Sequence, residues 1–128
     1  MSVLGIGVDL VECARIQHSL DRFGEKFLRR VFTEGEIQYC ESKANRVERY
    51  AARFAAKEAA FKALGTGWRN GVRWLDVEVR NLPSGKPELT LVGQALEVGR
   101  RLRVHRSSLS LSHTDRYAIA QVIFESDG

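Results

Sequence analysis

The sequence predicts an α+β fold with a single domain, in which an antiparallel sheet is packed with helices. Three observations support this prediction. Apolar residues alternate with other residues at residues 3–9 and run almost without interruption through residues 117–124, and both patterns are typical of strands. Residues 46–64 have the length and alanine content of a long helix. The 128 residues are 44% hydrophobic, enough to bury one core, and we expect residues 1–128 to form one domain.

The first strand has two unlike faces. One face carries Leu4, Ile6 and Val8, and the other carries Gly5, Gly7 and Asp9. We expect the apolar face to pack in the core and the glycine face to stay bare, with room for a ligand to approach the backbone.

Helical spacing predicts a first helix over residues 10–20, with Asp9 as N-cap and Glu12 completing a capping-box-like pair. Gly24 interrupts this region before a second helical stretch that reaches residue 30. Thr33 and Glu36 form another capping box, ahead of a helix that reaches about residue 42.

The clearest helix covers residues 46–64 and ends at Gly65. Beyond a glycine loop, residues 74–80 and 88–92 are expected to pair as a hairpin around a turn at residues 82–87. A weaker helix is expected over residues 93–102. Two last strands, at residues 108–112 and 117–124, meet near residues 114–115, and the last strand is apolar on both faces.

Bulk properties narrow the function classes. The formal net charge of +4 and the pI near 9.4 favour anionic partners. No apolar run approaches the roughly 20 residues needed to span a bilayer, and no leader of the secretory kind precedes the first strand, so we expect a cytoplasmic protein. Cys13 and Cys40 lack the spacing of a zinc or redox site, and we expect two buried free thiols.

Glu58 is the most unusual residue of the long helix, because it falls within the apolar stripe centred on Phe54. A buried carboxylate needs a cation, a basic side chain or a proton. Lys62, one turn further along, is the obvious local partner, so ordinary ion pairing and a functional role both remain open.

Asp9 is the second candidate. An Asp that directly precedes a helix is usually an N-cap, but one of its oxygens could cap while the other binds a metal. Two carboxylates on separate elements, with lysines nearby, suit a hard cation such as Mg²⁺ that also binds substrate phosphates and water.

Two segments carry a resemblance to a known family. GIGVD at residues 5–9, with Arg15 and Ile16, and FAAKEAAFKALGTG at residues 54–67 resemble the two signature motifs of 4'-phosphopantetheinyl transferases of the holo-acyl-carrier-protein synthase type. The turn at residues 84–87 and the segments at residues 110–113 and 117–120 resemble the family's hairpin turn and last strand pair. The similarity covers nearly the whole chain.

The resemblance implies an enzyme that moves 4'-phosphopantetheine from coenzyme A to a serine of apo acyl carrier protein, in support of fatty acid biosynthesis. Asp9 and Glu58 would hold Mg²⁺ against the coenzyme A diphosphate, and 3',5'-ADP would leave. Lys62 would neutralise charge on phosphoryl oxygens. Either Glu58 or a water on the metal could take the serine proton.

The resemblance also implies which residues hold coenzyme A; these are Arg53, Lys62, Gly65, Gly85, Lys86, Pro87 and His113. Taken without the family, Arg53 would belong to a solvated helix face and His113 to a turn. The loop at residues 65–71 could bind phosphate through backbone N–H groups, although it follows a helix and so lacks the order of a P-loop.

Acidic carrier proteins need a basic docking surface. Arg15 and Arg22, with Lys26 and Arg29, offer such a surface, and Arg15 and Arg22 would share a face if the first helix reached that far. A solvated basic face is the alternative. The resemblance further implies a homotrimer with active sites between subunits, which would cover the second apolar face of the last strand. We expect no nucleic-acid or membrane partner.

Two other classes of protein would each explain part of the sequence. A small RNA-binding module would use the basic pI and the arginines at residues 100–106, but it has no use for carboxylates at Asp9 and Glu58. A structural oligomerisation domain would explain the apolar last strand but not Glu58. Magnesium-dependent binding of coenzyme A distinguishes the transferase from both.

Overall fold

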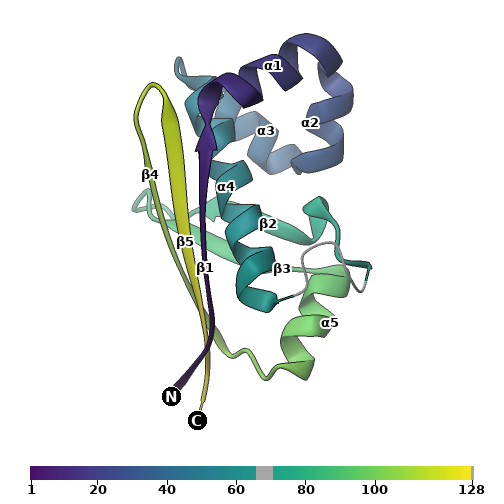
Figure 1. Cartoon of the computed structure of the whole chain (residues 1–128), viewed down its shortest axis with the longest axis vertical. Helices are drawn as coiled ribbons and strands as arrows, with labels where there is room; N and C mark the ends of the chain where they lie inside the picture. The colour runs from purple at the N-terminus through teal and green to yellow at the C-terminus, as the bar shows by residue number, and fades with distance from the viewer. Residues whose placement is uncertain (66–70, 128) are drawn as a thin grey trace.

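A computed structural model of the chain describes residues 1–65 and 71–127. Three long strands run side by side along the molecule, the first three helices gather at one end, and both chain termini lie at the other (Figure 1). In chain order the elements are β1 (Ser2–Glu12), α1 (Cys13–Phe23), α2 (Glu25–Val31), α3 (Glu34–Glu41), α4 (Arg46–Leu64), the short 3-10 helix η2 (Trp74–Asp76), β2 (Val77–Asn81), β3 (Pro87–Leu91), α5 (Gly93–Arg101), β4 (Arg106–His113) and β5 (Tyr117–Ser126).

The strands form two antiparallel sheets. One has three strands in the order β1-β5-β4, and the other is the β2–β3 hairpin. α4 packs along β1 and β5 and also contacts β2. The α+β class with antiparallel strands and packed helices is confirmed, but the strands are divided between two sheets where the sequence suggested one.

The prediction for the faces of β1 was wrong. Leu4, Ile6 and Val8 are between 42% and 58% exposed, and the glycine face packs on α4. A Cβ on Gly7 would lie 1.8 Å from the carbonyl oxygen of Ala59, and one on Gly5 would lie 2.0 Å from that of Ala63. The glycines are therefore needed because a helix backbone lies directly against the strand.

Asp9 does not cap a helix, which corrects a second prediction. β1 continues as far as Glu12, which pairs with Tyr117 of β5, and α1 begins only at Cys13. This pairing with a strand a hundred residues away extends β1 through the positions that have helical spacing. Asp9 therefore lies within the sheet, opposite Ala120.

Most helix predictions were confirmed. α4 has the predicted bounds and ends at Gly65, whose φ of 75° is the left-handed conformation that glycine favours. The Thr33–Glu36 capping box is present at the start of α3. Cys13 and Cys40 are buried and free. None of the helices in the described part of the chain is long and apolar enough to cross a membrane.

We predict that Gly7→Ala destabilises the protein by at least about 3 kcal/mol, because the added methyl group cannot fit against the Ala59 carbonyl. Urea unfolding followed by circular dichroism measures the change. Gly35→Ala is the control, since its Cβ would meet nothing closer than 3.4 Å and alanine favours the helix. Equal stability of the two variants would contradict the close contact.

Candidate active site

Asp9 and Lys62 form one half of the candidate site. The Lys62 ammonium lies 2.9 Å from Asp9 Oδ1 and donates a hydrogen bond of 3.1 Å to the Val8 carbonyl. The sequence suggested Lys62 as the partner of Glu58, but the lysine instead joins α4 to β1 at Asp9. Both signature motifs thus meet at this contact.

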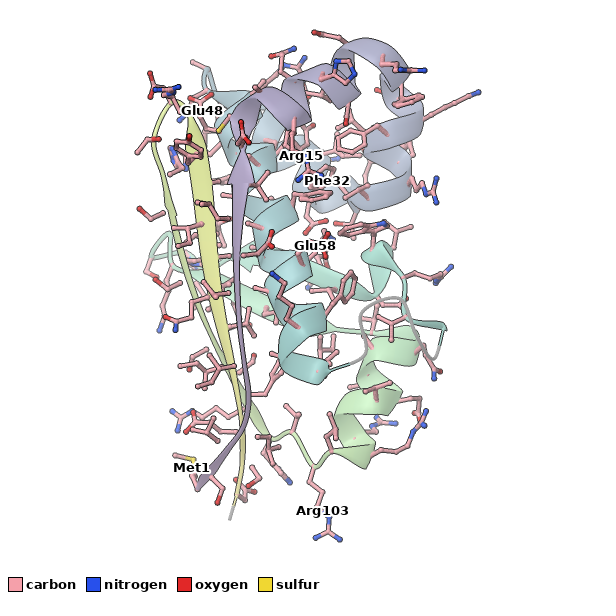
Figure 2. All side chains as sticks on the ribbon, in the orientation of Figure 1. Met1, Arg15, Phe32, Glu48, Glu58 and Arg103 are labelled. Atoms are coloured by element: carbon pink, nitrogen blue, oxygen red, sulfur yellow. The ribbon has the colours of Figure 1, made fainter. Side chains whose placement is uncertain are left out.

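Glu58 is partly buried and close to Asp9. Burial and then the Asp9 carboxylate raise the pKa of Glu58, whereas Lys62 and Arg15 act to lower it. Glu58 makes no ion pair or side-chain hydrogen bond with any residue that the structure describes. Simple ion pairing therefore does not account for it, and the two neighbouring carboxylates leave negative charge that a cation could neutralise. Figure 2 shows Glu58 midway along α4, with Arg15 on the side of the first helix.

Lys57, the residue before Glu58, makes the buried ion pair of this region. Its ammonium lies 2.9 Å from Glu36 Oε1 with both side chains fully buried, and it also donates to the backbone oxygens of Trp74 and Val77. Burial lowers the pKa of Lys57. Glu36 in turn accepts a hydrogen bond from the backbone N–H of Val79. The pair fixes α4 to α3 and β2. The sequence reasoning missed it because Glu36 was assigned only to a helix cap.

Arg53 is not on a solvated face, because only 3% of its surface is exposed. Its guanidinium donates to Asn81 Oδ1 and lies over the ring of Tyr39, 4.1 Å from the ring centroid. Its Nε is buried without a partner among the described residues. Asn81 donates onward to the Gly85 carbonyl, so Arg53 is linked to the turn that carries Lys86 and Pro87.

Two nearby cations were missed by the sequence reasoning. Arg49 donates to the Tyr39 hydroxyl at 3.3 Å, and the Lys43 ammonium lies 5.2 Å from the centroid of the same ring. Their clustering depends on how α3 packs beside α4. Spacing alone gives no sign of it.

The predicted coenzyme A residues do not all lie together in one chain. At about 100 degrees per residue, Arg53 points about 180 degrees away from Lys62 around α4. His113 lies on the helix-facing side of β4, opposite Ala118, whereas Asp9 is on β1 at the other edge of the sheet. The predicted residues of one chain therefore fall into two separate groups, which we call half-sites: Asp9, Glu58 and Lys62 form one, and Arg53 with the turn at residues 84–87 forms the other. Residues 66–70 of the predicted phosphate loop lie outside the described residues.

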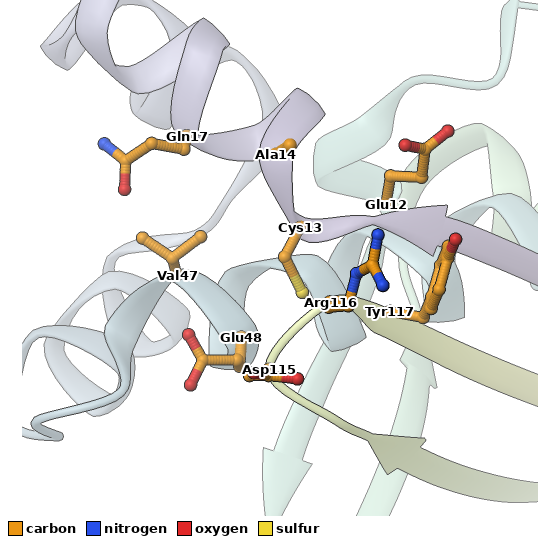
Figure 3. A pocket seen from close by; sticks show the side chains of 9 residues that line it. All are labelled: Glu12, Cys13, Ala14, Gln17, Val47, Glu48, Asp115, Arg116 and Tyr117. Atoms are coloured by element: carbon orange, nitrogen blue, oxygen red, sulfur yellow. The ribbon is translucent and has the colours of Figure 1, made fainter.

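A pocket of about 380 Å³ opens where α1 and α4 begin, beside the β4–β5 turn (Figure 3). The carboxylates of Glu12, Glu48 and Asp115 line it, with Arg116 as the single arginine. Its net negative charge makes it a poor site for a phosphate. We therefore do not place the reaction in this pocket.

The predicted docking residues are exposed on one side of the helical end. α1 runs unbroken from Cys13 to Phe23, so Arg15 and Arg22 share a face, as expected. Arg29 is paired with Glu25 and Glu34 and is less available. An adjacent groove of about 360 Å³ is mainly apolar; its lining comprises Ser19, Phe23, Lys26, Phe27, Arg30, Val31, Phe54 and Trp74.

Arg103, in the arginine-rich segment at residues 100–106, lies far from Glu58 and Arg15. Figure 2 shows Arg103 at the end of the molecule that also holds Met1, whereas Glu58 and Arg15 lie toward the other end. The segment therefore takes no part in the Asp9–Glu58 cluster.

Known proteins resemble this chain over nearly its whole length. The sequence profile of the 4'-phosphopantetheinyl transferase superfamily matches residues 5–122. A holo-[acyl-carrier-protein] synthase of Solibacter usitatus is 56% identical, with 96% of this chain and 98% of the relative covered. The crystal structure of a Bacillus anthracis holo-(acyl-carrier-protein) synthase in complex with CoA (3',5'-ADP) superposes with a TM-score of 0.80 at 40% identity, covering 98% of each chain. The Neisseria meningitidis synthase gives a TM-score of 0.88 at 35% identity, covering 98% of this chain and 100% of the other.

Proposed function

We propose that this chain, which belongs to the 4'-phosphopantetheinyl transferase superfamily, is a holo-acyl-carrier-protein synthase. It transfers 4'-phosphopantetheine from coenzyme A to a serine of apo acyl carrier protein and releases 3',5'-ADP. The observation that carries this conclusion is the meeting of Asp9, Glu58 and Lys62 from the two family motifs. A cytoplasmic location stays a prediction.

The reaction forms one phosphorus–oxygen bond and breaks another. The serine oxygen attacks the β-phosphorus of coenzyme A, and the bond from that phosphorus to the bridging oxygen breaks. Lys62 brings positive charge to the phosphoryl oxygens. Glu58 would accept the serine proton, since its carboxylate makes no ion pair with the described residues.

We propose that Asp9 and Glu58 hold Mg²⁺. Two points support this assignment. The two carboxylates are close enough for Asp9 to raise the pKa of Glu58, and oxygen is the ligand atom that Mg²⁺ prefers. The described residues contain no group of three or more His, Cys, Asp or Glu side chains able to hold an ion alone, so substrate and water oxygens would complete its shell. When bound, Mg²⁺ neutralises charge that develops on the phosphoryl oxygens.

We propose that the second half-site holds the nucleotide part of coenzyme A. Arg53 supplies a buried guanidinium, and the Asn81–Gly85 hydrogen bond orders the turn that carries Lys86 and Pro87. Gly65 and His113 stay family-based assignments to this part of the substrate.

A homotrimer with sites between subunits would unite the two half-sites. The outer face of the three-stranded sheet supports this proposal, because it leaves Leu4, Ile6, Val8, Leu10 and Ile119 between 41% and 62% exposed. An apolar strip of this kind is typical of a surface that another copy covers. A neighbouring copy could then bring its Arg53 side to the Asp9 side of this chain.

We propose that the carrier protein docks on the face that holds Arg15 and Arg22. Acidic carriers complement these cations, and the mainly apolar groove beside them lies between α1 and Phe54, one helical turn before Glu58. Arg15 also acts electrostatically on Glu58, so docking and chemistry are adjacent there.

The decisive experiment incubates an apo acyl carrier protein with the enzyme, coenzyme A and Mg²⁺. Mass spectrometry should show the phosphopantetheine increment on the carrier, and EDTA should abolish it. A carrier of unchanged mass would contradict the proposed function.

We predict that Glu58→Gln lowers the transfer rate at least about 100-fold but leaves the metal-free protein equally or more stable. Neutralising one of two mutually repelling carboxylates removes an electrostatic repulsion, whereas breaking a buried ion pair would cost about 3–5 kcal/mol of stability. Mg²⁺ with coenzyme A should raise the melting temperature of the wild type and barely change that of the variant. A large loss of stability with transfer intact would contradict the assignment of Glu58.

We predict that Arg22→Glu weakens carrier binding at least about tenfold and leaves coenzyme A binding unchanged, because Arg22 faces the carrier and does not act on Glu58. Calorimetric titration of both ligands measures this. Arg103→Glu, a matched reversal at the far end of the molecule, is the control. Equal weakening by the two reversals would argue against the docking face.

We predict that Ile6→Asp dissociates the assembly and abolishes activity, because a carboxylate would be buried in the sheet-face contact. Light scattering should show a trimer mass for the wild type and a monomer mass for the variant. Leu102→Asp, equally an exposed aliphatic position but off this sheet, should stay trimeric. A fully active wild-type monomer would rule out shared sites.

A further inference from the structure

Three cationic side chains from two neighbouring segments contact Tyr39. The Arg53 guanidinium is stacked on its ring at 4.1 Å, the Lys43 ammonium approaches the ring at 5.2 Å, and Arg49 donates to its hydroxyl. Tyr39 is itself partly buried at the end of α3. One aromatic side chain thus contacts all three cations.

No carboxylate among the described residues pairs with any of the three cations around Tyr39, although neighbouring arginines are paired. Arg46, on the same helix, pairs with Glu41 at 2.8 Å, and Arg80 pairs with Glu78 at 2.8 Å. Arg53 is the most exceptional, since it is buried and its Nε has no described partner.

A buried guanidinium without a counter-anion is unfavourable, and three clustered cations repel one another. The aromatic ring offsets part of this cost through cation–π attraction but supplies no negative charge. The arrangement is therefore that of an anion site, in which a ligand provides the missing counter-charge.

We propose that Tyr39 is a positioning residue that holds Arg53 and Arg49, with Lys43 beside them, for the 3'-phosphomonoester of coenzyme A. This inference rests on the proposed function. Coenzyme A carries a diphosphate and, separately, a phosphomonoester on its ribose. The diphosphate belongs with Lys62 at the reacting end, whereas the Tyr39 cluster lies on the opposite side of α4. A dianionic phosphomonoester matches the excess of cations in the cluster.

The ring acts by fixing geometry. A guanidinium is planar and binds phosphate well only when its N–H groups face the oxygens, so stacking on a ring prepares it before the substrate arrives. The hydroxyl accepts from Arg49 and orients the second guanidinium. Tyr39 need not touch the substrate, and its effect should appear in binding rather than in the chemical step.

The test compares coenzyme A with 3'-dephospho-coenzyme A in the full-length enzyme with Mg²⁺ and apo carrier. The wild type should prefer coenzyme A at least about tenfold in kcat/KM. Tyr39→Leu should reduce that preference about fivefold or more by raising the KM for coenzyme A, with kcat unchanged and dephospho-coenzyme A little affected. Tyr39→Phe keeps the ring and should retain most of the preference.

Two arginines of α4 provide a matched pair. Arg49→Gln should reduce the preference, because it removes a cation of the cluster. Arg46→Gln removes an arginine already neutralised by Glu41 and should leave the preference as in the wild type.

The same comparison is made by calorimetric titration of the two nucleotides, which decides the inference even if no carrier is modified. Equal affinity of the wild type for both nucleotides overturns it. An equal loss for both in Tyr39→Leu also overturns it, because that result indicates a purely structural role. Failure of transfer with the nucleotide preference intact would instead count against the proposed function alone.

Discussion

The close contact between β1 and α4 is the constraint on which the rest of the structure depends. Gly5 and Gly7 let the carbonyl oxygens of Ala63 and Ala59 approach where any side chain would clash. The same strand face continues to Asp9, so the contact that holds the helix also brings this carboxylate beside Glu58. It also turns the large aliphatic side chains of β1 outward. One packing requirement thus determines both the proximity of Asp9 to Glu58 and the face that forms the proposed subunit interface.

On the opposite side of α4, a buried ion pair holds the helix against its neighbours. Lys57 and Glu36 are fully buried, and such a pair is tolerated only where further hydrogen bonds satisfy both groups. Here backbone oxygens of Trp74 and Val77 accept from Lys57, and a backbone N–H donates to Glu36. Because Lys57 and Glu58 are adjacent, anchoring the first toward α3 and β2 fixes the direction of the second.

Sequence patterns over a few residues correctly predicted the features that depend on those residues alone. The capping box at Thr33 and the end of α4 at Gly65 follow from side-chain and backbone preferences that act over a few residues. The buried face of β1 was predicted wrongly, because alternation defines two faces but does not say which one meets a helix. Asp9 was taken as a cap for a similar reason, since only pairing with β5 keeps its segment extended. The cations around Tyr39 come together only when α3 packs beside α4.

The two half-sites connect the apolar strip on β1 with the proposed function as well as with the proposed assembly. A helix cannot present Arg53 and Lys62 to one small ligand when they point to opposite sides of it. In the proposed trimer, a ligand that uses both would lie between two copies, and a surface other than the site itself would hold those copies together. The outward side chains of β1 offer that surface, and they point outward because glycines occupy the inner face. The geometry that places Asp9 beside Glu58 thus also leaves exposed the strip through which a neighbouring chain could complete the site.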